Sequence, residues 1–378
     1  MSLYDVYGNE LTFGDGVSGD EVPQVYDVNG NPLLNRKPIK HYDYADDPDP
    51  DKPYVWDYDL QELQLIQGKK FTVGIETDTH YLEATTNIGY HNIDYVSQLK
   101  NMTKRLYFDF ITNLGDIPRG WAFAEDITAN TKARLDEMMR RYTDYVECPV
   151  LIATGNHDNS NNYALQHGSS MTYVISKEDL YASEIGSTKR TTTIVEPGNY
   201  ARYYYKDFPE CRVIVLDSND YPYQEVSDYD VHGNHHTFSE AQVAWFANTA
   251  LNTDKPVLVL SHNVLKTEVA TSAGITMTVP EEDKQYDSSI PYRADEIVDA
   301  LEAFQNNGGL VVASFSGHIH RQGAAKIDGI NYVSFGNGGN FVEIAFIDFD
   351  NRTITTKIVG DSTSDRNDRE LVERSFTF

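Results

Sequence analysis

The chain has 378 residues, with 31 Lys and Arg against 58 Asp and Glu, so its formal net charge is −27. A surface with this much negative charge repels nucleic-acid backbones and anionic lipids, so we expect neither a duplex nucleic acid nor a membrane as partner. The apolar fraction of 40% can fill a sizeable core, and no eighteen-residue apolar run or secretory signal is present, which predicts a soluble or cytoplasmic protein.

Residues 1–66 differ in composition from the rest, being rich in Asp, Asn, Gly, Pro and Tyr. Within them, Tyr4–Leu11 recurs as Tyr26–Leu33 with the shared pattern YDV-x-GN-x-L, in which the Gly-Asn pairs are turn residues. We therefore predict a small β-rich N-terminal appendage of hairpins and linker over residues 1–66, and a separate main domain over residues 67–378.

From residue 71 onward, short apolar or β-branched runs alternate with helical segments, which predicts βαβ units. The predicted strands are 71–77, 106–113, 149–154, 211–217, 256–261 and 309–315. The predicted helices cover 121–146 and the residues after a capping box formed by Ser239 and Gln242. Beyond His320, four strand-like runs at 324–327, 330–334, 341–349 and 352–359 predict a second sheet, mixed or antiparallel. Cys148 and Cys211 stand beside apolar runs, where reduced buried thiols are expected.

Polar groups follow five of these predicted strands. Because ligand sites assemble at the carboxyl ends of strands in open α/β sheets, we expect the five groups to converge. Singly, each has a structural explanation: Asp78 as a cap, Asp116 in an Asx-turn, Asn156 in a left-handed turn. Together they supply Asp, Asn and His donors in the number that a dinuclear site for divalent cations needs. The groups are Thr77-Asp78-Thr79-His80, Leu114-Gly115-Asp116, Thr154-Gly155-Asn156-His157-Asp158, Ser261-His262-Asn263 and Ser316-Gly317-His318-Ile319-His320.

In this order, the motifs D-x-H, GD, GNHD, a lone His after a strand and GH-x-H resemble those of the calcineurin-like metallophosphoesterase superfamily, over roughly residues 70–360. The resemblance implies an α/β fold, an α+β sandwich of two mixed sheets that pack face to face and are flanked by helices. It also implies a set of metal ligands. These are Asp78, His80 and His320 for one metal ion, Asn156, His262 and His318 for the other, and Asp116 as the bridge between them.

The same resemblance implies two divalent metal ions, Mn, Fe or Zn, that supply a bridging hydroxide for hydrolysis of a phosphomonoester or phosphodiester. His157 resembles the family's histidine that is not a ligand and assists departure of the leaving group. Asn156 is also expected to donate its amide to a phosphoryl oxygen. Arg119 and Arg321 follow metal motifs directly, and each is equally consistent with a phosphate clamp and with a structural partner of the carboxylates.

Two differences from subgroups of this family narrow the range of expected activities. No second Asp follows Asp116 closely, so protein phosphatase activity is not expected, and Arg119 stands where purple acid phosphatases have a Tyr ligand, so a tyrosinate-bound iron is not expected either. The expected substrate is a small or flexible phosphoester. Within the long insertion 219–237, His235 and His236 are expected to be exposed loop residues rather than extra ligands.

A different class of function is also consistent with the sequence. The repeated pattern in residues 1–66 looks like short modules of phage-type surface proteins. The chain would then be a structural component of an assembly, or a glycan-binding one, with a weakly active metallophosphoesterase domain, and virion association would follow. The complete set of expected ligands favours the enzyme, because a binding role needs neither His157 nor an open dinuclear site.

Overall fold

The computed structural model describes residues 66–80, 106–118, 127–145, 148–159, 174–220, 236–279, 290–336, 341–360 and 371–378. The predicted appendage over residues 1–66 lies outside this part of the chain except for its last residue, and so do Arg119 and His235. The domain boundary at residue 66 therefore stays a prediction. Among the described helices, none combines the length and the apolar character that crossing a bilayer requires.

The first sheet has six strands in the order β12-β11-β10-β1-β2-β3. Parallel pairing joins β1 to β2 and β2 to β3, and antiparallel pairing joins β1 to β10, β10 to β11 and β11 to β12, so the sheet is mixed. In the first of these antiparallel pairs, Phe71 lies opposite Ile347. The strands are β1 Phe71–Glu76, β2 Phe110–Asn113, β3 Val150–Ile152, β10 Phe341–Asp348, β11 Thr353–Gly360 and β12 Arg374–Thr377.

The second sheet also has six strands, in the order β4-β5-β6-β7-β9-β8. Its four central strands are parallel, and β4 and β8 pair antiparallel at its edges. The central strands are apolar and buried on both faces, as parallel strands covered by two layers must be. The strands are β4 Tyr204–Asp207, β5 Arg212–Val215, β6 Val257–Leu260, β7 Val311–Ser316, β8 Gly323–Ile327 and β9 Ile330–Ser334.

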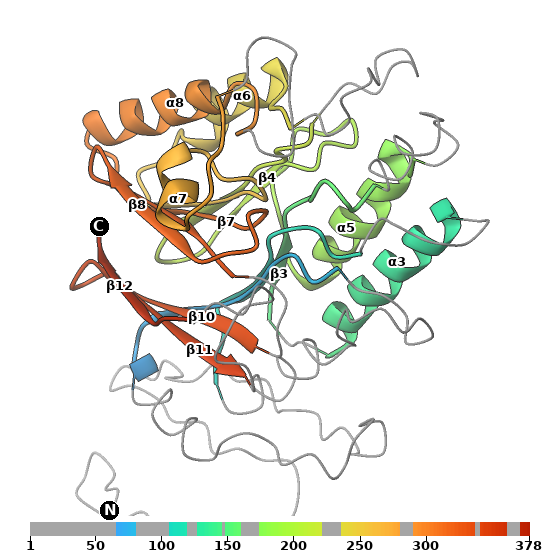
Figure 1. The fold of residues 1–378 in the computed structure, drawn as a ribbon, viewed down its shortest axis with the longest axis horizontal. Coiled ribbons are helices and arrows are strands. Elements are labelled where there is room, and N and C mark those ends of the chain that lie inside the picture. The colour runs from blue at the N-terminus through green and yellow to red at the C-terminus, as the bar shows by residue number, and fades with distance from the viewer. Residues whose placement is uncertain are drawn as a thin grey trace, which may run out of the picture. The chain divides into compact units, whose positions relative to one another are not determined.

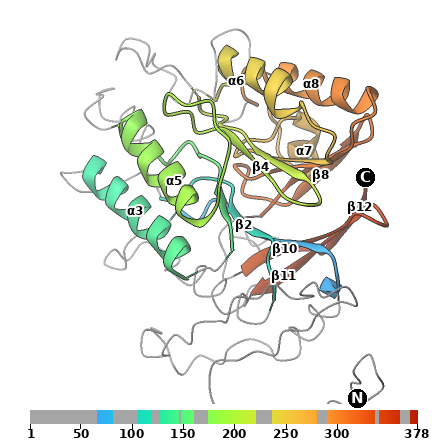
Figure 2. The ribbon, with the colours of Figure 1, turned by 180° about the vertical axis from the view of Figure 1, so that it is seen from behind.

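Helices cover the outer faces of the two sheets. In Figures 1 and 2, α3 and α5 lie side by side, apart from the group formed by α6, α7 and α8. Ser176 caps the first turn of α5, and Ser239 caps α6 by accepting a hydrogen bond from the amide of Gln242, as the capping box predicts. The helices are α3 Ile127–Tyr145, α5 Lys177–Thr191, α6 Glu240–Trp245 continued by a π turn over Phe246–Ala250, α7 Thr267–Ser272 and α8 Ala294–Asn306.

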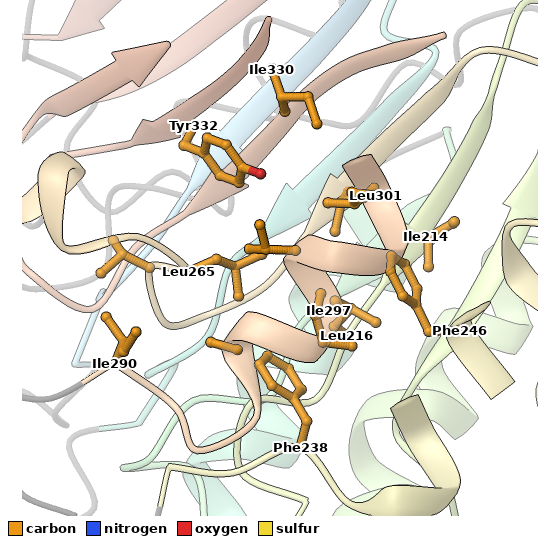
Figure 3. Close-up of a cluster of buried hydrophobic side chains, with 14 of the residues drawn as sticks. Ile214, Leu216, Phe238, Phe246, Leu265, Ile290, Ile297, Leu301, Ile330 and Tyr332 are labelled. Carbon is orange, nitrogen blue, oxygen red and sulfur yellow. The ribbon is translucent and has the colours of Figure 1, made fainter. Parts of the chain in front are cut away.

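Three groups of buried apolar side chains hold these layers together. One lies between the sheets and joins residues such as Val73 of β1 to Leu258 of β6. A second joins the first sheet to α3 and α5, and a third joins the second sheet to α6, α7 and α8. Figure 3 shows the third group, in which Ile297 and Leu301 of α8 lie beside Ile214. The predicted sandwich of two mixed sheets flanked by helices is thus confirmed.

The assignment of the C-terminal strands to one sheet of their own is wrong. Strands β8 and β9 complete the second sheet, whereas β10, β11 and β12 complete the first. The reason is that β10 is buried along most of its length, so it needs a neighbour inside a covered sheet, and the free side of β1 provides one. The predicted strand 106–113 begins only at Phe110, since the Asp109 side chain accepts a hydrogen bond from the amide of Thr72.

Candidate metal centre

All seven predicted metal ligands lie just past the carboxyl ends of strands. Asp78 and His80 follow β1, Asp116 follows β2 and Asn156 follows β3 in the first sheet. In the second sheet His262 follows β6, and His318 and His320 follow β7. Both sheets therefore present their polar loops to one region, which is the arrangement expected for ligand sites in α/β folds.

The backbone is strained at most of these positions. Ten described residues other than glycine have a positive φ in the left-handed region. Such conformations cost about 1–3 kcal/mol each and persist where the surroundings over-determine them, often at functional sites. Here the amide of Asp78 donates to the carbonyl of Gly115, and that of His80 donates to the carbonyl of Asp116, both at 2.9 Å. Five of the ten are predicted ligands, namely Asp78, His80, Asp116, His318 and His320.

Two glycines allow the ligand loops to approach one another. A Cβ on Gly155 would lie 2.1 Å from the amide nitrogen of Asp116, and a Cβ on Gly317 would lie 1.8 Å from Thr77 Oγ1. Real Cβ atoms do not come this close to other atoms, so only glycine fits. The glycines of the GNHD and GH-x-H motifs therefore have a packing reason that is independent of chemistry.

Four side chains form what we call the first donor cluster. One ligand atom from each lies within 4.8 Å of the others. His80 Nε2 is 3.1 Å from His320 Nε2, and His320 Nε2 is 3.3 Å from Asp78 Oδ1. The members of the cluster are Asp78, His80, Asp116 and His320.

A second donor cluster lies beside it and shares Asp116. Asn156 Oδ1 is 3.0 Å from His262 Nε2 and 3.1 Å from His318 Nδ1, and the two imidazole nitrogens are 3.2 Å apart. Asp116 Oδ2 is 3.4 Å from His262 Nε2 and 3.9 Å from His80 Nε2. One carboxylate oxygen thus lies between the two clusters, as a bridging ligand would.

The outer atoms of both carboxylates are already bonded within the protein. Asp78 Oδ2 accepts hydrogen bonds from the Thr77 hydroxyl at 2.6 Å and from the amide of His318 at 2.9 Å. Asp116 Oδ1 accepts from the amide of His157 at 2.8 Å. His262 Nδ1 donates to the carbonyl of Leu114 at 2.8 Å, which leaves its Nε2 facing the cluster. The atoms that face the clusters are therefore fixed by their outer contacts.

The protonation of most of these groups suits cations. His262 is the exception: although burial lowers its pKa, the Asp116 carboxylate raises it to about 9, so its imidazole must release a proton to bind a cation. Burial would raise the pKa of the Asp78 and Asp116 carboxyls, but neighbouring histidines hold each pKa below its usual range. Burial and the charges of nearby histidines lower the pKa of His318 to about 3, so its imidazole is neutral and can act as a ligand. Carboxylate, amide and imidazole donors without thiolate fit Mn²⁺, Fe²⁺ or Zn²⁺ equally well. The two clusters therefore fit a divalent metal site, and the donor set leaves the identity of the metal open.

His157 stands at the edge of the clusters. Its side chain is 17% exposed, and its Nε2 is 3.8 Å from Asp116 Oδ2. The ring packs edge-on against that of His80, with centroids 4.7 Å apart. Its place and partial exposure are those of a group that can reach a bound molecule without being a ligand.

Comparison with known proteins now gives the family. The model of the calcineurin-like phosphoesterases matches residues 71–322, which is more than half of the chain. The chain belongs to the calcineurin-like phosphoesterase family. No curated protein sequence matches it significantly.

Solved structures of related fold are distant in sequence. A dimetal phosphatase from Danio rerio is 15% identical, with a TM-score of 0.55, and the match covers 81% of this chain and 98% of that one. A purple acid phosphatase from yellow lupin is 13% identical, with a TM-score of 0.46, and covers 82% of this chain and 54% of that one. At such identities the first likeness supports the calcineurin-like fold alone.

Asp158, next to His157, ties two ligand loops together. Its Oδ1 accepts from the amide of Ile117 at 2.7 Å, and its Oδ2 accepts from the amide of Gly155 at 2.6 Å. Burial and the nearby Asp116 raise the pKa of Asp158 to about 7. The last residue of the GNHD motif therefore joins the loop after β2 to the loop after β3.

A buried group on α3 supports the ends of β1 and β2 and was not recognised in the sequence. The Tyr142 hydroxyl donates to Glu76 at the end of β1 and accepts from Asn113 Nδ2 at the end of β2. Asn113 Oδ1 in turn accepts from the amide of Gly115 at 2.9 Å, next to Asp116. The helical spacing of Tyr142 predicted its burial, but no local pattern reveals its partners across the sheet.

Two sequence expectations can be compared directly with the structure. Arg321 donates to the carbonyls of Ala273 and Gly274 just past the end of α7, at 3.4 and 3.3 Å, which favours its structural interpretation. The expectation of an exposed His236 is wrong: the residue is 0% exposed and its ring lies against that of His318. The reason is that the backbone has already returned to the core, since Thr237 donates to the carbonyl of Ser218. The buried Phe238 and the capping box that follow were the available signal.

Proposed function

We propose that this phosphoesterase is a metal-dependent hydrolase of small or flexible phosphomonoesters or phosphodiesters. The observation that carries the proposal is the position of Asp116 Oδ2 between two donor clusters, 3.4 Å from His262 Nε2 and 3.9 Å from His80 Nε2. A shared carboxylate with three further donors on each side is what a dinuclear hydrolytic centre requires.

The proposed ligands follow the two clusters. Asp78, His80 and His320 hold one cation, Asn156, His262 and His318 hold the other, and Asp116 holds both. When bound, two divalent cations neutralise phosphoryl charge and acidify a water molecule near neutral pH. The metal is Mn, Fe or Zn in this proposal, because the donors accept each of them.

The remaining steps belong to side chains of the protein. Asn156 points its Oδ1 into the second donor cluster, so its amide Nδ2 is left to donate to a phosphoryl oxygen. His157 Nε2 gives a proton to the oxygen of the leaving group, for which its partial exposure beside the clusters is suitable. Arg119 as a phosphate clamp stays a prediction, since it lies outside the described residues.

The test is hydrolysis of p-nitrophenyl phosphate and bis-p-nitrophenyl phosphate by chelator-treated protein with Mn²⁺, Zn²⁺ or Fe²⁺ added back. We expect turnover that depends on added metal, and the ratio of the two rates distinguishes a monoesterase from a diesterase. His157→Ala should lower the rate about 10²–10⁴-fold, the usual contribution of a general acid. Metal-independent turnover, or full activity in His157→Ala, would contradict the proposal.

The matched control is Asn331→Ala. Asn331 is buried, and its amide donates to the carbonyl of Thr377 at 2.9 Å. Asn331 lies near the start of β9, and the other end of this strand, Ser334, contacts the loop after β7 through a hydrogen bond to the carbonyl of Gly317. This variant loses a buried polar contact without touching either cluster, so its activity should equal that of the wild type.

A further inference from the structure

His236 lies in contact with the second donor cluster although no motif includes it. Its side chain is fully buried, and its ring meets the ring of His318 at 4.8 Å between centroids and 68° between planes. The His318 ring also meets that of His262, at 5.0 Å and 72°. His318 thus packs edge-on against two imidazoles.

The position of His236 is itself fixed by Asn219. His236 Nδ1 donates to Asn219 Oδ1 at 3.0 Å, and Asn219 Nδ2 donates to the carbonyl of Thr154 at 3.1 Å. The amide of Asn219 donates to Asp217 Oδ1 at 2.9 Å, and Asp217 forms an ion pair with the buried Arg202 at 2.6 Å. Asn219 therefore links His236 both to the loop after β3 and to a buried ion pair.

The backbone on both sides of the insertion is anchored at the same place. The amide of Thr237 donates to the carbonyl of Ser218 at 2.8 Å, and the amide of Asp220 donates to the carbonyl of Thr237 at 3.2 Å. The Asp220 side chain also pairs with Lys177 at 3.2 Å. His236 consequently stands on a rigid base rather than on a free loop.

The orientation of the His318 ring decides whether the second donor cluster exists. Its Nδ1 must point at Asn156 Oδ1 and His262 Nε2, 3.1 and 3.2 Å away, and a rotation about the Cβ–Cγ bond would turn Nδ1 out of the cluster. An imidazole has a broad preference about this bond, so packing must select the angle. The ring of His236, packed against that of His318, restricts this rotation.

We propose that His236 is a positioning residue for the second metal ion: its ring, fixed by Asn219, holds His318 in the orientation that binds the cation. The inference rests on the metal-binding half of the proposed function and not on hydrolysis. His236 touches a ligand, not the substrate, so it is no catalytic residue. Contacts of this outer kind are worth about 10–100-fold in metal affinity.

The experiment isolates each cluster by removing one ligand of the other. In the His320→Ala background only the second donor cluster keeps its own ligands, and in the His318→Ala background only the first does. We titrate each metal-free protein with Mn²⁺ by calorimetry and by electron paramagnetic resonance. Adding His236→Ala should weaken binding about 10-fold in the first background and leave it unchanged in the second.

A conservative variant separates positioning from general loss of packing. His236→Phe keeps a ring against His318 but lacks the Nδ1 donor, so affinity should return to within about 3-fold of the parent, since ring packing is the effective part. Asn219→Ala should weaken binding at the second cluster less than His236→Ala does. Asn331→Ala, the control without contact to the site, should leave both affinities unchanged.

Equal affinities with and without His236→Ala in the His320→Ala background, or equal losses in both backgrounds, would overturn the inference. So would a Phe variant as weak as the Ala variant. If His236→Ala does not fold, the Asn219→Ala variant decides by the same comparison of the two backgrounds. Binding of two cations by the wild type without any hydrolysis would overturn the proposed function and leave this inference standing.

Discussion

The two donor clusters share Asp116 but are built by different means. In the first cluster, Asp78, His80 and His320 all have left-handed backbone conformations, and the His320 side chain is 32% exposed. In the second cluster only His318 shares that conformation, Asn156 and His262 lie outside the set, and His262 is completely buried. The first cluster therefore depends more on the path of the backbone, and the second more on side chains packed and hydrogen-bonded around it.

This difference indicates which substitutions should disturb the ligands of each cluster. A change at Gly317 should harm the first cluster, because a new Cβ there would meet Thr77 and Asp78 in the strained loop after β1. A change in an outer side chain should harm the second, because its ligands are aimed by contacts such as the one between His236 and His318. The following predictions test this contrast.

The largest effect should come from Asp116→Asn, which removes what the clusters share. Because Oδ1 accepts from the amide of His157, the new NH₂ group is expected to take the place of Oδ2 and face both clusters. Mn²⁺ affinity at both clusters should fall by more than about 100-fold, since even outer contacts are worth about 10–100-fold. Calorimetric titration measures this, and retention of one intact site would show that Asp116 does not bridge.

Removal of metal should distinguish the clusters by exposure. A chelator reaches a partly exposed ligand set before a buried one, so one equivalent of Mn²⁺ should leave the first cluster before the second is emptied. Electron paramagnetic resonance during chelator addition would follow the change from a coupled pair to a single ion. Release in one step, or earlier release in the His320→Ala than in the His318→Ala background, would contradict the contrast.

Gly317→Ala should damage the first cluster. The new Cβ would lie 1.8 Å from Thr77 Oγ1 and 2.7 Å from Asp78 Oδ2, so the residues after β1 must move. Overpacking of this kind costs about 1–3 kcal/mol of unfolding free energy, and Mn²⁺ affinity should fall in the His318→Ala background.

Gly186→Ala is the control for this glycine substitution. Gly186 lies inside α5, where a Cβ would come no closer than 4.0 Å to the Tyr181 carbonyl oxygen. Alanine is favoured over glycine in a helix interior by about 1 kcal/mol, so this variant should be as stable as the wild type or more so. Equal destabilisation of both variants, measured by denaturant unfolding, would argue against a specific clash at Gly317.

Tyr142→Phe should lower stability without selecting a cluster. Loss of the hydroxyl leaves the buried Glu76 and Asn113 side chains without this partner. An unsatisfied buried polar group costs about 1–3 kcal/mol. Denaturant unfolding gives the change, and Tyr205→Phe, on the partly buried strand β4, serves as the control. A change below about 0.5 kcal/mol, typical of surface substitutions, would argue against the role of Tyr142.

The smallest effect should be a pH dependence far from the ligands, at the start of β2. Burial, with the nearby Glu210, raises the pKa of Asp109 from 3.8 to about 7 despite the hydrogen bond from Thr72. The folded chain therefore keeps a proton that the unfolded chain has released, and the free energy of unfolding falls as pH rises from about 4 to about 7. In Asp109→Asn this pH-dependent fall in the free energy of unfolding should disappear, a change on the order of 1 kcal/mol after allowance for solvent screening. An unchanged slope in denaturant unfolding would contradict this.

Much of the fold followed from local pattern. The apolar runs at 71–77 and 256–261 form β1 and β6, because a short apolar, β-branched run bounded by polar residues favours a buried strand. The edge strands β4 and β12 were not predicted, since their sequences YYKD and RSFT mix polar and aromatic residues. The pairing of strands within the sheets was harder to predict, because periodicity identifies a strand but not the strand beside it.

The ligands of the candidate site could be predicted from the sequence, but the contacts around them could not. The order of strand ends and of Asp, Asn and His residues indicated which side chains meet, and the structure brings all seven predicted ligands together. The roles of His236 and Asp158 were not predicted, because each depends on contacts between segments distant in sequence. Arg119 and the alternative of a structural component with an N-terminal appendage stay predictions.

The antiparallel pair of β1 and β10 has a consequence for synthesis of the chain. β1 carries the first ligand loop, yet Phe71 finds its partner in Ile347, near the opposite end of the sequence. During translation the free side of β1 must wait until β10 has been made, and such late, non-local pairing is slow and exposes unpaired strands. The ligands after β1 therefore gain their final support only after β10 has been synthesised.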